Sequence, residues 1–112
     1  MSFTYLASPY TAPTRVLREK RFRMVARAAA KRMVTGEVVY SPIVHGHIVE
    51  TVGDIGEQSH SFWMRQCFPM LRHAGKLVVL MLEGWESSMG VQMEIETARA
   101  SGIPIEYMEY AE

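Results

Sequence analysis

The sequence has few of the features that mark specialised protein classes. Its 112 residues include a single cysteine, Cys67, which excludes an intramolecular disulfide. Twelve basic and twelve acidic residues cancel, so no overall charge favours nucleic acid or a membrane surface as a partner. The longest apolar run, at 76–84, is too short to span a bilayer. Because the chain also begins without a basic-then-apolar leader, we expect a cytoplasmic protein.

Short apolar segments alternate with helical patterns along the chain. The predicted strands are 3–7, 37–41, 76–82 and 104–108. The predicted helices are 14–35, 59–74 and 88–101. Residues 42–59 contain glycines and no sustained periodicity, so we expect a long loop there. This alternation predicts one domain, 1–112, of the α/β class: an open, doubly wound, flavodoxin-like parallel sheet of four to five strands with helices on both faces.

Ligands of such sheets bind beyond the carboxyl ends of the strands, where the chain forms turns. Three of these turns, 8–11, 41–47 and 84–88, hold most residues with useful chemistry. The expected substrate-binding residues are Ser8, Pro9, Tyr10, His45, His47, Trp85, Ser87, Ser88 and Gly90. Tyr10 and Trp85 are aromatic and can stack on a base, although Trp85 is equally suited to a subunit contact.

The start of the third predicted helix, in GWESSMG, is typical of an anion-binding site. Ser87 or Ser88 can cap the helix, and Gly90 leaves its first turn open to a ligand. Glu94 lies one and a half turns further, and helical side chains lean toward the N-terminus, so its carboxylate is predicted to point back toward the strand ends. Such a carboxylate can act as a nucleophile, or it can be an ordinary helix-start acid that pairs with Arg99 or solvent.

Three segments in the same order resemble a known enzyme superfamily. The segments YLASPY at 5–10, VVYSPIVHGH at 38–47 and GWESSMGVQMEIETA at 84–98 are similar to the nucleoside 2-deoxyribosyltransferases, and most of all to a branch of small bacterial and phage domains of unassigned function. The last segment also resembles the motif of the 2'-deoxynucleoside 5'-phosphate N-hydrolases, in which a serine precedes the catalytic glutamate by six positions. Here these residues are Ser88 and Glu94.

The resemblance implies roles for particular residues. Glu94 would attack the anomeric carbon and form a glycosyl-enzyme, and Tyr5 would contact and orient Glu94. Ser88 would hold the 5'-phosphate or a sugar hydroxyl. It also implies a homodimer or homotetramer whose neighbouring subunit closes the pocket, as the small size of the domain suggests independently. The ligand would be a nucleoside or nucleotide.

One residue departs from the family pattern. The family carries an aspartate that protonates or hydrogen-bonds the departing base, and Cys67 stands where that aspartate is expected. A thiol is a poor proton donor to a purine or pyrimidine. Either another group substitutes, with Asp54, His45 and His47 as candidates, or the glycosidase activity is lost.

The histidines of the second turn allow two interpretations. His45 and His47 can chelate a metal if both rings converge, with His60 and Cys67 completing the set, but their spacing matches no compact zinc pattern. We therefore expect both rings to line the ligand pocket, with no metal and no cofactor.

The first predicted helix carries most of the positive charge. Its basic residues are Arg15, Arg18, Lys20, Arg21, Arg23, Arg27, Lys31 and Arg32, and Glu19 is the lone acid among them. We interpret this face as solvated surface from which Arg15 and Arg18 can reach a phosphate. No aromatic interleaving accompanies the charge, so nucleic acid is not expected as a partner.

Three functional classes follow from these observations. The first is an N-glycosidase or deoxyribosyltransferase with Glu94 as nucleophile, which Glu94 and Tyr5 favour. The second is a catalytically silent nucleotide-binding module, which Cys67 favours. The third is a regulatory subunit that uses its basic helix and methionines for partner contacts.

Overall fold

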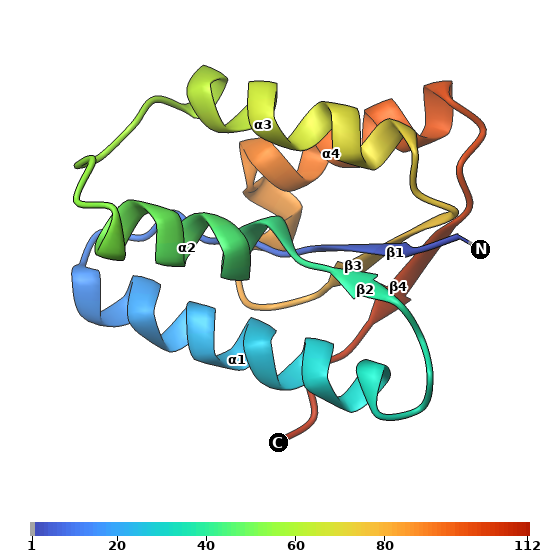
Figure 1. Ribbon diagram of the computed structural model, residues 1–112, viewed down its shortest axis with the longest axis horizontal. Coiled ribbons are helices and arrows are strands. Elements are labelled where there is room, and N and C mark those ends of the chain that lie inside the picture. The colour runs from blue at the N-terminus through green and yellow to red at the C-terminus, as the bar shows by residue number, and fades with distance from the viewer. Residues whose placement is uncertain (1) are drawn as a thin grey trace.

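The fold alternates strands and helices along the chain, and the computed structural model describes residues 2–112 (Figure 1). The strands are β1 (Thr4–Ala7), β2 (Val39–Tyr40), β3 (Lys76–Leu80) and β4 (Ile105–Met108). The helices are α1 (Arg15–Met33), α2 (Pro42–Val52), α3 (His60–Arg72), the short 3-10 helix η1 (Trp85–Ser87) and α4 (Met89–Ala100). Each α-helix begins after a serine or threonine whose hydroxyl accepts a hydrogen bond from a first-turn N–H.

The four strands form one parallel sheet in the order β2-β1-β3-β4. Helices α1 and α2 lie on one face of the sheet, and α3 and α4 lie on the other (Figure 1). This order and this layering confirm the prediction of a doubly wound, flavodoxin-like sheet. In the register, Tyr5 of β1 lies between Tyr40 of β2 and Leu77 of β3.

The two faces of β3 build two separate cores. Leu77 and Val79 pack with residues of α3 and α4, whereas Val78 and Leu80 pack with residues of α1. Successive strand side chains point to opposite faces, so a strand that is apolar at every position is covered on both sides. The apolar run at 76–82 therefore occupies an inner position of the sheet, as predicted.

The prediction of a loop over residues 42–59 is wrong for its first eleven residues, which form α2. Ser41 caps this helix and Pro42 occupies its first turn, a pairing that is a recognised helix start. Gly46 and several β-branched residues within α2 have low helix propensity, which hid the periodicity. Only residues 53–59 connect α2 to α3 without regular structure.

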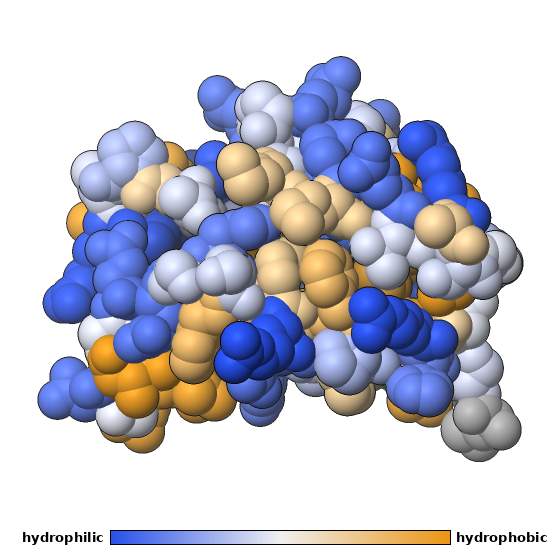
Figure 2. Space-filling model, turned by 90° about the horizontal axis from the view of Figure 1, so that it is seen from above, coloured by the Kyte–Doolittle hydropathy of each residue, from blue (hydrophilic) through white to orange (hydrophobic). Residues whose placement is uncertain are grey.

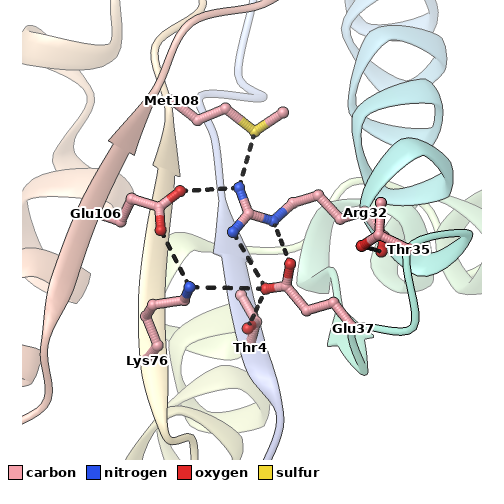
Figure 3. A network of polar contacts seen from close by, with 7 residues as sticks. All are labelled: Thr4, Arg32, Thr35, Glu37, Lys76, Glu106 and Met108. Carbon is pink, nitrogen blue, oxygen red and sulfur yellow. Dashed lines mark hydrogen bonds and ion pairs between the residues drawn. The ribbon is translucent and has the colours of Figure 1, made fainter.

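At the amino ends of the strands, charged side chains form a compensated network (Figure 3). The guanidinium of Arg32 pairs with Glu37 at 2.9 Å and with Glu106 at 3.0 Å. Lys76 pairs with the same two carboxylates, at 3.9 and 3.0 Å. Although burial opposes its ionisation, hydrogen bonds from Thr4 and Arg32 hold the pKa of Glu37 below its ordinary value. The network connects the end of α1 to β1, β3 and β4.

The outer surface combines hydrophilic and apolar regions. Seen from the side of α3 and α4, apolar side chains gather in the middle of the surface, between hydrophilic ones (Figure 2). Phe62, Met70 and Met89 are exposed on these two helices. None of the described helices has the length and hydropathy needed to cross a membrane.

The network predicts a stability effect at Arg32. Arg32→Ala leaves two partly buried carboxylates without their shared partner, and we expect the free energy of unfolding to fall by about 1–3 kcal/mol. Urea denaturation measures the change. Arg27→Ala, an exposed position on the same helix, is the matched control and should change stability by less than about 0.5 kcal/mol. Equal losses in the two variants would contradict a structural role for the network.

Candidate functional site

A cleft of about 350 Å³ opens at the carboxyl ends of β1 and β3. In this strand order the chain leaves β1 toward one face of the sheet and β3 toward the other, which opens a crevice between the two connections. Its walls come from the segment after β1, from α1, α2 and α3, from the connection between α2 and α3, and from the start of α4. Its volume lies in the lower part of the range for small-molecule sites.

Glu94 is a buried carboxyl group that lines this cleft. It lies on the inner side of α4, between Val91 and Ile95 of the core, and only 4% of its surface is exposed. Tyr5 of β1 donates a hydrogen bond to Glu94 Oε2. Within residues 2–112, no positively charged side chain pairs with this carboxyl group. Burial raises the pKa of Glu94 to about 7, although the hydrogen bond from Tyr5 acts to lower it.

Two weakly acidic groups, the Tyr5 phenol and the Cys67 thiol, lie close to the carboxyl group. Tyr5 is fully buried, and burial together with the neighbouring Glu94 raises the pKa of its phenol far above the ordinary value. Burial also raises the pKa of the Cys67 thiol to about 11, despite the phenol beside it. Both groups therefore stay protonated at neutral pH. The phenol orients Glu94, and the thiol is a poor acid.

Polar groups without partners belong to residues of the cleft wall. Ser8 directly follows β1 and is 3% exposed, and its hydroxyl finds no hydrogen-bond partner anywhere in residues 2–112. Ser88 caps α4 by accepting a hydrogen bond from the Val91 N–H, and Gly90 lines the cleft within the first turn. Buried polar groups normally have partners, and the first N–H groups of a helix lack them within the helix. These groups can therefore bind polar atoms of a ligand.

Tyr10, His47 and Glu19 form a hydrogen-bonded chain at another part of the wall. The Tyr10 hydroxyl lies 2.6 Å from His47 Nδ1, and His47 Nε2 lies 2.9 Å from Glu19 Oε2. The His47 ring stacks on Phe22 of α1, with centroids 4.0 Å apart. Tyr10 and His47 both line the cleft. Burial, with a contribution from nearby Glu50, raises the pKa of Tyr10 above its ordinary value.

The cleft brings together part of the predicted site. Of the expected residues, those that line it are Ser8, Tyr10, His47, Cys67, Ser88, Gly90 and Glu94. Tyr5 lies behind Glu94 and contacts it directly. The expected residues that do not line it are Pro9, His45, Asp54, Trp85 and Ser87.

Local structure explains why these residues lie elsewhere. His45 and His47 sit two positions apart on a helix rather than on a loop, so His45 points to the exposed side of α2. Asp54 is an exposed turn residue with a φ of 53°, a left-handed conformation that aspartate tolerates. Trp85 packs against Tyr107 of β4, with ring centroids 5.6 Å apart. The exposed Ser87 donates to the carbonyl of Gly84.

Several lining residues were not predicted from the sequence. Glu50 and Trp63 line the cleft, and Glu19 pairs with His47 Nε2. Arg18, which was expected to reach a phosphate, also lines the cleft. Glu19 had a visible signal, because it is the only acid in a strongly basic helix. The lining residues of α2 were hidden by the loop assignment. Within residues 2–112, no three His, Cys, Asp or Glu side chains are placed to hold a metal ion.

The buried carboxyl group predicts a pH-dependent stability. A glutamate in an unfolded chain has a pKa of about 4.3, so between this value and about 7 the folded protein binds more protons than the unfolded chain. The stabilisation from the protonated carboxyl is complete below about pH 4 and is lost as the pH rises through 7. Relative to Glu94→Gln, the wild-type free energy of unfolding should fall by roughly 3 kcal/mol between about pH 4 and pH 8.

Urea denaturation of both proteins across this pH range measures the difference. Glu96→Gln, an exposed position on the same helix, serves as control and should follow the wild-type curve. If the free energy of unfolding depended on pH in the same way for wild type and Glu94→Gln, the pKa of Glu94 would not be raised in the folded protein.

Comparison with known proteins identifies a family but no activity. No curated protein matches the chain. The family described as Domain of unknown function (DUF1937) matches residues 2–110. This description carries no information on nucleoside chemistry, so the resemblance to deoxyribosyltransferases stays a prediction. Because the match covers nearly the entire chain, the protein belongs to the DUF1937 family.

Proposed function

We propose that the protein cleaves or transfers the N-glycosidic bond of a nucleoside or nucleotide, with Glu94 as nucleophile. The observation that carries this proposal is a buried carboxyl group that lines a ligand-sized cleft without a cationic partner. A structural carboxylate would normally be exposed or paired with a cation, because burial of an isolated charge is costly. Perturbed titratable groups in clefts are typical of functional sites.

The reaction would proceed in two displacements. One oxygen of Glu94 is held by Tyr5, which leaves the other free to attack the anomeric carbon while the bond to the base breaks. The departing nitrogen takes the bonding electrons, and a glycosyl ester forms on Glu94. Water or a second base then attacks the same carbon, and the ester electrons return to the carboxylate. The attacking form is the anion, so turnover should rise as the pH passes through about 7.

Other residues of the cleft wall suit the phosphate and the sugar hydroxyls of a nucleotide. The capped start of α4, with Ser88 and Gly90, supports binding of a phosphate or a sugar hydroxyl. The unpaired hydroxyl of Ser8 offers a further hydrogen bond. Arg18 also lines the cleft and carries the positive charge that a phosphate would meet.

One observation favours a second candidate, a catalytically silent nucleotide-binding module. The thiol of Cys67 replaces the expected aspartate, and its raised pKa, about 11, makes it a poor proton donor. In such a protein the cleft and the α4 start would bind a nucleotide without cleaving it.

We also propose that the protein is a homo-oligomer. Ile48, Val49 and Val52 are exposed on α2, and a further apolar region lies over α3 and α4 (Figure 2). Association of subunits would cover such surfaces.

The direct test is release of free base from a panel of ribo- and deoxyribonucleosides and their 5'-phosphates, followed by chromatography. We expect release by the wild type and a loss of at least about 10³-fold in Glu94→Ala, because a missing nucleophile removes the covalent route. Glu96→Ala, exposed on the same helix, is the control and should retain full activity.

Two outcomes would decide between the candidates. Base release that persists in Glu94→Ala would contradict the nucleophile assignment. No release from any substrate, with thermal stabilisation by one nucleotide, would favour the silent binding module.

A further inference from the structure

The proposed reaction needs a proton for the departing base, and Cys67 is a poor source of it. We propose that Tyr10 donates this proton, that His47 Nδ1 resupplies it and that Glu19 holds the His47 ring through Nε2, so that the three residues form a proton relay. This inference rests on the proposed glycosidase function and names the residue that replaces the missing acid. Tyr10, His47 and Glu94 all line the same cleft.

The partners of His47 determine where its protons lie. A carboxylate can only accept a hydrogen bond, so Nε2, which lies 2.9 Å from Glu19, carries a proton. Nδ1, which lies 2.6 Å from the Tyr10 oxygen, can then be either unprotonated or protonated. Without a proton it accepts from the phenol, and with one it donates to the phenol and leaves the Tyr10 O–H free for another acceptor.

The surroundings hold the relay in one geometry. His47 is 8% exposed, and its ring stacks on Phe22 with an interplanar angle of 18°. The hydroxyl of Thr51 donates to the His47 carbonyl within α2. Glu19 is partly exposed and also pairs with Arg23 at 3.3 Å, so the far end of the relay is in contact with solvent.

The protons and charges balance in both displacement steps. In the first, the Tyr10 O–H proton moves to the base nitrogen, which takes the electrons of the broken glycosidic bond. The Nδ1 proton of His47 moves to the phenol oxygen, and both side chains end neutral. In the second, attacking water gives a proton to Tyr10, which passes its own proton to Nδ1. The enzyme returns to its first state, with free base and free sugar as products.

The charges beside Tyr10 explain why its proton transfer depends on His47. Burial, Glu50 and Glu19 raise the pKa of the phenol, and Arg18 acts in the opposite direction. The phenol therefore keeps its proton at neutral pH, but with a raised pKa it is a weak acid on its own. Its transfer to the base must be coupled to the transfer from His47 Nδ1, so that no phenolate forms.

The test compares leaving groups that need a proton with one that does not. The substrates are natural nucleosides or nucleotides and the 4-nitrophenyl ribofuranoside and 2-deoxyribofuranoside. Nitrophenolate departs without protonation. We expect Tyr10→Phe to slow first-turnover base release by about 10²–10⁴-fold and to change the first-turnover release of nitrophenol by less than about threefold. Tyr107→Phe, which removes an exposed phenol hydroxyl on β4, is the control and should leave both rates unchanged.

His47→Gln and Glu19→Gln test the positioning residues. Neither side chain is proposed to touch the sugar, so both variants should slow base release and spare nitrophenol release. A merely structural role would lower both rates together, because a distorted cleft also misplaces Glu94. Thermal unfolding of each variant reports whether the protein is folded.

The outcomes separate this inference from the proposed function. If the wild type releases base and Tyr10→Phe releases it equally fast, the relay is overturned and the glycosidase proposal stands. A parallel loss on both substrate types in a folded Tyr10→Phe protein also overturns the relay. If the wild type releases neither base nor nitrophenol, both proposals fail.

Discussion

The hydrogen bond between the Tyr5 phenol and the buried Glu94 carboxyl is the interaction around which the carboxyl end of the sheet is organised. A carboxyl group in an apolar layer needs a donor, and a donor on an inner strand needs a partner. Because β1 lies between β2 and β3, Tyr5 enters the core beneath α4. The first turn of α4 then opens toward the same cleft through Gly90. Strand order, helix placement and the cleft are thus connected through this pair.

The two ends of the sheet differ in how their charges are satisfied. At the amino end, Arg32 and Lys76 each pair with two carboxylates, and the whole set is compensated (Figure 3). At the carboxyl end, Glu94 has no cationic partner and the buried Ser8 hydroxyl has no partner among the described residues. Compensated charges are typical of structural networks, whereas uncompensated buried groups beside a cleft are typical of functional sites. The contrast within one small domain supports the placement of function at the carboxyl end.

Much of this architecture could be predicted from local patterns. The apolar run of β3 and the basic amphipathic α1 indicated a parallel sheet covered on both faces, and helix direction placed Glu94 toward the strand ends. The cleft wall formed by α2 was missed, because Gly46 and its β-branched neighbours masked a helix whose start was marked by Ser41 and Pro42. The link from Glu19 to His47 joins two separate helices, and sequence spacing carries no information on such a contact.

The most direct test of the central claim is a search for the covalent intermediate. The protein would be mixed with a substrate that it cleaves, quenched in acid within the first turnover, digested and analysed by mass spectrometry. The account predicts a peptide that contains Glu94 and is heavier by one ester-linked sugar. It predicts that this heavier peptide is absent from Glu94→Gln. Base release without any sugar adduct on that peptide, or with an adduct on another residue, would contradict it.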